Sequence, residues 1–269
     1  MYFELAGKRA FASTGGKPFD ASKPTVMFIH GSALDHTFWG LHSRFFAFRQ
    51  YSVLCPDLPG HTHSAGPCLD SIESMADWVA DVVASLGVTR LSLVGHSQGC
   101  LVALELAGRQ PEFLRSVSFI ASGCETPVNQ ALLDAARDDP PSAVAMMIGW
   151  GFGPAGHFHQ GRIPGASMLA GGRRTMDSNS AEALYADLRA CNSYRNGRGA
   201  AASILVPAQV ILGGKDRMTP RKAGLALAEA LPGCVLHVVE ESGHMVPIEA
   251  PDPCRALLSE FVFRHNPRD

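Results

Sequence analysis

The chain has 269 residues, of which 46% are hydrophobic and 18% charged, a composition that supports a large buried core and excludes global disorder. Its formal net charge of -2 at pH 7 argues against a protein that binds nucleic acid electrostatically. The seven cysteines include no Cys-x-x-Cys pair, which favours reduced thiols over a disulfide framework or a zinc site.

Short apolar runs rich in β-branched residues alternate with longer helical patterns. The runs predict buried strands at Thr25–Ile29, Ser52–Leu54, Leu91–Val94, Val117–Ile120, Gln209–Leu212 and Leu236–Val239. The patterns between them predict helices at Thr37–Phe48, Ile72–Leu86, Gln98–Arg109, Arg221–Ala230 and Pro253–Phe263. This alternation is typical of a doubly wound α/β fold, whose parallel sheet is covered by helices on both faces. Ligands of such folds bind beyond the carboxyl ends of the strands, so residues that follow a strand are candidate site residues.

The alternation stops between residues 124 and 203, where the pattern predicts no strand. Helical patterns occur there at Asn129–Arg137, Ser142–Ile148 and Ala181–Cys191, around a glycine-rich stretch. The segment also contains Met146, Met147, Trp150 and Phe152, which argue against a disordered loop and serve either packing or an apolar substrate wall. We therefore predict a core of residues 1–123 and 204–269, with 124–203 inserted as a helical cap over the strand ends.

A serine stands between glycines where the third predicted strand meets a helix, in Gly95-His96-Ser97-Gln98-Gly99. A turn this tight holds the serine in a strained backbone conformation and projects its hydroxyl from the sheet. The N–H of Gln98 lies at the start of the helix, where it has no intrahelical partner and the helix dipole favours negative charge. The pattern predicts Ser97 as a nucleophile and the Gln98 N–H as an oxyanion donor.

A serine nucleophile requires a base and an acid that orients the base. His244 follows the last predicted strand, and Asp216 follows the strand Gln209–Leu212. The chain order of serine, acid and histidine is the one expected for this type of sheet. Glu125, which follows another predicted strand, is the alternative acid.

The turn His30-Gly31-Ser32 follows the first predicted strand at its carboxyl end. The backbone N–H of Ser32 could therefore point at the same oxygen as that of Gln98, as a second oxyanion donor. We assign the side chain of His30 a structural role. The acidic side chain of Asp57, in Pro56-Asp57-Leu58-Pro59-Gly60, is expected to hold a turn through backbone hydrogen bonds.

Five segments together resemble the α/β-hydrolase superfamily. They are HGSALD (30–35), PDLPGHTHS (56–64), GHSQG (95–99), GGKDRMTP (213–220) and SGHMVPIEAP (242–251). The resemblance spans nearly the whole chain apart from the predicted cap. It implies an eight-stranded, mostly parallel sheet, the α/β-hydrolase fold, with the cap inserted after the sixth strand.

The resemblance also implies roles for individual residues. The nucleophile, acid and base of the superfamily fall on Ser97, Asp216 and His244, and its oxyanion positions fall on Ser32 and Gln98. The chain differs from its relatives at Thr62-His63, where they usually have a glycine, and at Cys100, where a further glycine is common.

These residues predict a serine hydrolase that cleaves a small carboxylic ester or a related acyl compound through an acyl-Ser97 intermediate, without a cofactor. By the same resemblance, a serine at the elbow argues against dehalogenases and epoxide hydrolases, which have an aspartate there. Carbon–carbon bond hydrolase, lactonase and thioesterase are alternatives with the same triad. A small-ligand receptor with a retained triad is the non-enzymatic alternative.

Several further features predict no additional site. The pairs His61 and His63, and His157 and His159, are not completed by a Cys, Asp or Glu cluster, so we expect no metal. Arg217, beside Asp216, is interpreted as an exposed loop charge and not as an anion clamp. No apolar run approaches the roughly 18 residues of a membrane span, and no signal peptide is recognisable. We expect a soluble cytoplasmic protein with a small-molecule substrate and no membrane or nucleic-acid partner.

Overall fold

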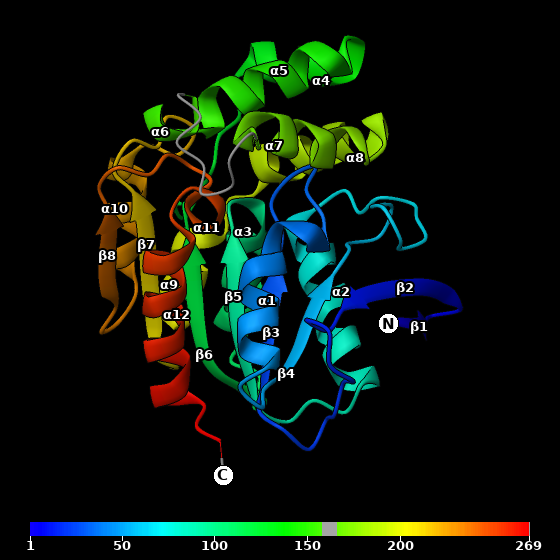
Figure 1. Ribbon diagram of the computed structural model, residues 1–269, viewed down its shortest axis with the longest axis vertical. Coiled ribbons are helices and arrows are strands. Elements are labelled where there is room, and N and C mark those ends of the chain that lie inside the picture. The colour runs from blue at the N-terminus through cyan, green and yellow to red at the C-terminus, as the bar shows by residue number, and fades with distance from the viewer. Residues whose placement is uncertain (158–165, 269) are drawn as a thin grey trace.

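The computed structural model describes residues 1–157 and 166–268, and its central feature is an eight-stranded sheet (Figure 1). The strands are β1 (Tyr2–Leu5), β2 (Lys8–Ser13), β3 (Thr25–Ile29), β4 (Ser52–Pro56), β5 (Leu91–His96), β6 (Leu114–Ile120), β7 (Ala208–Gly213) and β8 (Val235–Val239). Their spatial order is β1-β2-β4-β3-β5-β6-β7-β8. In this order, the strands β4, β3, β5, β6, β7 and β8 are parallel to one another. At one edge, β1 pairs antiparallel with β2, and β2 pairs antiparallel with β4. This confirms the predicted fold class.

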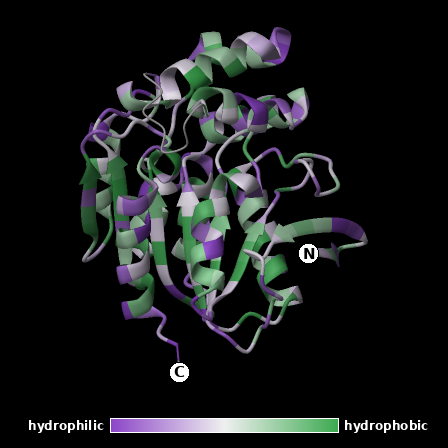
Figure 2. Cartoon of the chain, viewed as in Figure 1, coloured by the Kyte–Doolittle hydropathy of each residue, from purple (hydrophilic) through white to green (hydrophobic). Residues whose placement is uncertain are grey.

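Helices cover both faces of the sheet. They are η1 (His36–Trp39), α1 (Gly40–Ala47), α2 (Ile72–Ser85), α3 (Gln98–Gly108), α10 (Arg221–Ala230), α11 (Val246–Glu249) and α12 (Pro251–His265). In Figure 1, α1 and α12 lie in front of the sheet, and α2 and α3 lie behind it. Each face has its own hydrophobic core, one beneath α2 and α3 and the other beneath α1 and α12. Figure 2 shows the strands between these layers as mostly hydrophobic, because both of their faces are buried.

A run of helices follows β6 before the chain returns to the sheet at β7. These helices are α4 (Gln130–Asp138), α5 (Pro140–Gly151), α6 (Pro154–His157), α7 (Met168–Asp177), α8 (Ala181–Ser193) and α9 (Gly197–Ser203). Side chains at their N-termini explain several of the starts, because Asn129, Asp139, Ser167 and Ser180 each accept a hydrogen bond from the first turn. In Figure 1, α4 to α8 lie beyond the carboxyl ends of the strands.

The last helix of this run, α9, has a different position. It packs against α3, where a Cβ on Gly108 would lie 2.9 Å from the Cα of Ala200, and Ala201 is buried in the core beneath α3. Helix α9 therefore covers the face of the sheet, although it belongs to the segment 124–203 that we predicted as the cap.

Several elements have no counterpart in the predictions from residue patterns. Strands β1 and β2 lie at the sheet edge, where β1 alternates between exposed and half-buried residues and so lacks a continuous apolar run. Only the resemblance, through its eight strands, accounted for them. Helix α7 follows the glycine-rich stretch and contains two glycines, which mask its helical pattern. In the described ranges, no helix is both long and apolar enough to cross a membrane.

Candidate active site

Ser97 occupies a sharp turn between β5 and α3. Its backbone φ is 52° and its ψ is -118°, a conformation that a residue with a side chain rarely adopts. A Cβ on Gly95 would lie 2.3 Å from the Gly99 carbonyl oxygen, and one on Gly99 would lie 2.3 Å from the carbonyl oxygen of Ile29. The two glycines are therefore required by close backbone contacts, and the turn has the geometry expected of a nucleophile elbow.

The structure brings His244 and Asp216 into direct contact. The Nδ1 of His244 lies 2.8 Å from Oδ2 of Asp216, and both side chains are almost fully buried. Oδ1 of Asp216 accepts hydrogen bonds from the N–H groups of Met218 and Thr219, at 2.8 and 2.9 Å. Because its carboxylate is held by two backbone donors, Asp216 presents a fixed oxygen to the imidazole. This leaves Nε2 of His244 as the nitrogen that is available to a reacting group.

Ser97 and His244 line one cavity of about 330 Å³ beneath the helices that follow β6. Ser32 lines the same cavity, together with residues of the segment 124–203. The cavity residues are Gly31, Ser32, Leu34, His96, Ser97, Thr126, Pro127, Val128, Asn129, Leu132, Met147, Trp150, Leu188, Cys191, Arg217, Met218, Thr219, His244 and Met245. Three of the five predicted site residues thus meet at one concave surface, and Asp216 lies directly behind His244.

The two predicted oxyanion donors are the backbone N–H groups of Ser32 and Gln98. Ser32 belongs to the turn after β3, and Gln98 is the first residue of α3. Their backbone N–H groups donate no hydrogen bond to another group in residues 1–157 and 166–268. The side chain of Gln98 is buried away from solvent, with its Nε2 3.5 Å from the sulfur of Met75. Gln98 is not among the described residues that line the cavity, so its backbone N–H remains its only candidate donor to a ligand.

The alternative acid and the predicted apolar cap residues have distinct positions. Glu125 is exposed after β6 and is not among the described residues that line the cavity. Met147 and Trp150 line the cavity, whereas Phe152 is buried in the hydrophobic core. Only some of these apolar residues therefore face the cavity.

His96, in the middle of the elbow motif, is a site residue that the sequence analysis did not single out. Its ring centroid lies 4.9 Å from that of His244, and its Nε2 lies 3.0 Å from the His244 carbonyl oxygen. Burial and the neighbouring His244 lower the pKa of His96 far below its ordinary value, so its ring is neutral and Nε2 donates. Its place between Gly95 and Ser97 was the available signal, because that side chain must point into the loops at the strand ends.

Glu249 holds the loop that carries His244. Its two carboxylate oxygens accept hydrogen bonds from the N–H groups of Gly153, Gly243 and Met245. The carbonyl of Gly151 in turn accepts from the N–H of His244 at 2.9 Å. Hydrogen bonds through Glu249, the acidic residue of the segment SGHMVPIEAP, therefore join the end of α5 to the His244 loop.

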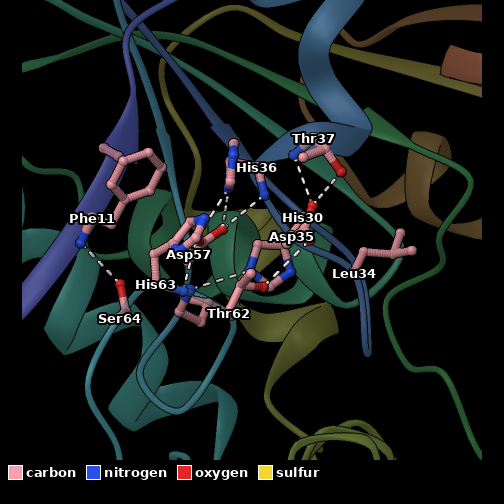
Figure 3. Close-up of polar contacts among 12 residues, drawn as sticks. Phe11, His30, Leu34, Asp35, His36, Thr37, Asp57, Thr62, His63 and Ser64 are labelled. Atoms are coloured by element: carbon pink, nitrogen blue, oxygen red, sulfur yellow. Dashed lines mark hydrogen bonds and ion pairs between the residues drawn. The ribbon is translucent and has the colours of Figure 1, made fainter. Parts of the chain in front are cut away.

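The turn after β3 is held by a second polar cluster, shown in Figure 3. Asp57 accepts hydrogen bonds from the backbone N–H groups of His36 and His63, and the His36 ring lies 2.9 Å from its Oδ1. Asp57 therefore holds backbone, as predicted from the sequence, and also binds an imidazole. Thr62 has a φ of 32° and donates to Asp35 and Asn179 through its hydroxyl, which ties this loop to the end of α7.

His30 and His61 have structural partners. His30 accepts a hydrogen bond from the N–H of Leu58 at Nε2, and its Nδ1 donates to the carbonyl of Gly31. The ring of His61 lies 3.0 Å from the carboxylate of Asp187. Among the described residues, no group of three or more His, Cys, Asp or Glu side chains is arranged to hold a metal. His159 lies outside the described residues.

We predict that His36 makes the stability of the protein depend on pH. Burial lowers the pKa of His36, but the hydrogen bond and charge of Asp57 outweigh burial, so the pKa is raised. A raised pKa contributes stability that is full below the unfolded value of about 6.5 and is lost as the pH rises through the folded value. Urea unfolding should therefore show that His36→Gln lowers the free energy of unfolding more at pH 5.5 than at pH 9.

His265 provides a control of opposite sign. Burial and the charge of Arg264 lower its pKa, so His265 opposes folding below pH 6.5. His265→Gln should therefore change the free energy of unfolding, relative to wild type, more favourably at pH 5.5 than at pH 9. Equal pH trends for the two variants would contradict the His36–Asp57 assignment.

Residues 26–257 match the model of a protein family described as the alpha/beta hydrolase family. The chain belongs to this family. As an alpha/beta hydrolase it is 30% identical, over 261 residues, to an uncharacterized protein of Mycobacterium tuberculosis, an alignment that covers 88% of this chain and 73% of the relative.

Solved structures resemble this alpha/beta hydrolase closely in fold. The enol-lactonase from Burkholderia xenovorans LB400 has a TM-score of 0.86 and 22% identity, with 97% of this chain and 99% of that chain covered. An esterase from Exiguobacterium antarcticum has a TM-score of 0.85 and 17% identity, with coverage of 97% and 98%. At these identities, the similarity establishes the shared fold of the alpha/beta hydrolase.

Proposed function

We propose that the chain is a serine hydrolase that cleaves a small carboxylic ester or a related acyl compound. The observation that carries the proposal is the strained elbow of Ser97, which shares a cavity with His244 while Asp216 holds the far side of the His244 ring. A serine at such a turn, a histidine and a buried carboxylate are the parts of a catalytic triad, which is recognised by geometry and role. The names of two structural neighbours, an esterase and an enol-lactonase, support acyl chemistry.

The mechanism follows from the roles of these atoms. Oγ of Ser97 attacks the acyl carbon, and Nε2 of His244 takes the hydroxyl proton. Asp216 orients the ring through Nδ1 and stabilises the imidazolium that forms. The backbone N–H groups of Ser32 and Gln98 donate to the oxyanion of the tetrahedral intermediate.

The imidazolium of His244 then protonates the leaving group, which departs and leaves an acyl-Ser97. A water molecule, deprotonated by His244, attacks this ester, and collapse of the second tetrahedral intermediate releases the acid and restores the serine. The chain's own groups supply every proton transfer in this sequence.

The cavity restricts the substrate to small compounds. Its volume of about 330 Å³ lies at the lower end of the roughly 300–1,000 Å³ that is common for ligand pockets. Leu132, Met147 and Trp150 give it apolar walls from the segment 124–203. We infer that this segment acts as the cap and that it selects a short, largely apolar acyl or alcohol group.

The proposal is tested by labelling the native protein with a fluorophosphonate and locating the adduct by mass spectrometry. We expect one adduct, on the peptide that contains Ser97, and loss of ester hydrolysis in proportion to labelling. Labelling at another residue, or none, would refute the nucleophile. A receptor with a retained triad would give a single slow turnover, whereas the proposed enzyme gives repeated turnover.

Substrate comparisons separate the proposed activity from its alternatives. Turnover of short aryl esters is measured beside that of a lactone, a thioester and a vinylogous diketone of similar size. We expect the esters, or the ester-like lactone, to be cleaved fastest. Preferred cleavage of the diketone would instead indicate a carbon–carbon bond hydrolase.

Arg217, which we interpreted from the sequence as an exposed loop charge, lines the cavity, and we predict that it favours substrates whose short apolar chain ends in a carboxylate. Of the described residues that line the cavity, Arg217 is the only lysine or arginine. A charge-assisted hydrogen bond contributes roughly 1.5–3 kcal/mol, and about 1.4 kcal/mol corresponds to a tenfold change in affinity. Arg217→Gln should therefore raise KM about 10-fold for a half-ester of a short dicarboxylic acid and change KM for the neutral methyl ester less than about 2-fold.

Lys215→Gln serves as the matched control, because Lys215 is exposed on the same loop and is not among the described residues lining the cavity. It should leave both KM values unchanged. Equal effects of the two variants would indicate a general surface charge effect and refute a specific contact by Arg217.

A further inference from the structure

A fully buried carboxylate of α8 lies against the turn that carries Ser32. Oδ2 of Asp187 accepts a hydrogen bond from the N–H of Ala33 at 2.8 Å and lies 3.0 Å from Nε2 of His61. Asp187 has no exposed surface, and the side chain of His61 is 1% exposed. Asp187 belongs to the helices beyond the strand ends, whereas Ala33 and His61 follow β3 and β4 in the core. The contact therefore joins the proposed cap to the proposed oxyanion loop.

The partners of His61 show that its ring is positively charged. Its Nε2 lies 3.0 Å from the carboxylate of Asp187, and its Nδ1 lies 3.2 Å from the carbonyl oxygen of Pro59. With the Asp187 carboxylate ionised, both partners are acceptors, so both ring nitrogens donate, as only an imidazolium can do. The pKa values of the two groups agree with this ion pair. Asp187 outweighs burial and raises the pKa of His61, while His61 outweighs burial and lowers the pKa of Asp187.

The hydrogen bond from Ala33 restrains a strained residue. Ala33 has a φ of 55°, in the left-handed region that is unfavourable for an alanine. It immediately follows Ser32, so the Ala33 N–H and the carbonyl of Ser32 belong to one rigid peptide plane. Fixing this plane fixes one side of Ser32 and limits the directions in which the preceding N–H can point.

We propose that Asp187 is a positioning residue that holds the oxyanion loop, so that the Ser32 N–H faces the developing oxyanion, with protonated His61 locking the Asp187 carboxylate in place. The inference rests on the proposed function, because it assigns a purpose to the loop only if Ser32 serves as an oxyanion donor. The cap then shapes the substrate site and also completes the machinery that stabilises the transition state. Loss of the Asp187 contact should therefore weaken transition-state binding more than substrate binding.

The test compares Asp187→Ala and Asp187→Asn with Glu105→Gln. Glu105, in α3, is likewise a buried carboxylate that ties a following segment to the core, through Tyr194 and Asn196 at 2.9 Å each, but it makes no hydrogen bond or ion pair with residues 30–36. Glu105→Gln therefore controls for loss of stability, and urea unfolding measures the stability of all three variants.

Activity is measured with p-nitrophenyl butyrate, and binding with propylboronic acid and with butyrate.

The boronic acid forms a tetrahedral adduct with Ser97 Oγ and places an oxygen at the oxyanion position, whereas butyrate represents the unreacted acyl group. Removing an oxyanion donor outright typically costs about 10²–10³ in turnover. Because Asp187→Ala only loosens the loop, we expect kcat to fall by about 10- to 100-fold, and the Ki of the boronic acid to rise by a similar factor. KM and the Ki of butyrate should change less than about 3-fold, and Glu105→Gln should leave all four values near those of the wild type.

Asp187→Asn retains an acceptor for the Ala33 N–H and should show a smaller loss of kcat than Asp187→Ala. The proposal is overturned if Asp187→Ala leaves kcat and boronic acid binding within about 2-fold of wild type, or if boronic acid and butyrate lose affinity equally. A wild-type protein that binds no boronic acid, or a Ser97→Ala variant that keeps full activity, would contradict the proposed function instead.

Nitrogen NMR of the native protein tests the ion pair of His61 and Asp187 without an Asp187 variant. We expect both ring nitrogens of His61, assigned by their loss in His61→Gln, to carry protons at pH 6. The groups that face His61 are Asp187 and Asp57, which favour its charge, and His30, whose neutral ring lies 5.0 Å away between centroids at an interplanar angle of 52°. A neutral His61 at pH 6 would refute the claim that a protonated His61 holds the Asp187 carboxylate in place.

Discussion

Replacing Ser97 with alanine should lower kcat for a short aryl ester by about 10⁶-fold, the size of the effect when the nucleophile of a serine triad is removed. The reason is that His244 and the oxyanion donors have no alternative group within the elbow from which to build an acyl intermediate. The residual rate would come from the oxyanion donors acting on water. Steady-state assays at high enzyme concentration measure both rates. A loss below about 10-fold would show that Ser97 is not the nucleophile.

The strained backbone of Ser97 supplies a control for folding. A residue held at such φ and ψ values costs about 1–3 kcal/mol, so Ser97→Gly should relieve strain that Ser97→Ala retains. We expect both variants to be inactive, with the glycine variant more stable by about 1 kcal/mol in urea unfolding, net of the backbone entropy of glycine. A glycine variant less stable than the alanine variant would contradict the strain assigned to the elbow.

Asp216→Asn should lower kcat by about 10⁴-fold, the effect of replacing the orienting acid of a serine triad. The asparagine side chain keeps the size of the carboxylate, but its amide can present a donor to Nδ1 of His244. The imidazole then adopts the tautomer in which Nε2 carries the proton and cannot accept one from Ser97. Pre-steady-state measurement should locate the loss in acylation, with KM little changed.

Glu125→Gln is the matched control for the acid, since it makes the same chemical change at the alternative carboxylate. Glu125 is exposed, so kcat should stay within about 2-fold of the wild type. The opposite result, with activity lost in Glu125→Gln and kept in Asp216→Asn, would transfer the role of the acid to Glu125.

Much of the fold follows from local patterns. Buried parallel strands have continuous apolar runs, so Thr25–Ile29 and Leu91–Val94 were predicted with little error, and the helix after Ser97 was predicted from its start. The edge strands β1 and β2 were not, because a half-exposed strand has no such run and its pairing depends on a neighbour far along the chain.

The site divides along the same line. Ser97 is recognisable from a few residues, because the strand, the two glycines and the helix that form the elbow are contiguous. His244 and Asp216 could be placed at the strand ends but could not be brought together from the sequence, since their contact spans 28 residues and depends on how two loops fold over the sheet. The sequence predicted Asp216 as the acid and Glu125 as the alternative, and in the tertiary structure Asp216 lies against the imidazole.

Asp187 is the residue that local reasoning had least chance of finding. Within its helix it has no neighbouring motif, and its partners, Ala33 and His61, precede it by 154 and 126 residues. The sequence by itself determined the fold class and the elbow, because periodicity and tight turns are local properties. Only the tertiary structure decided which distant charged groups meet in the buried interior, because burial of a charge depends on every segment packed around it.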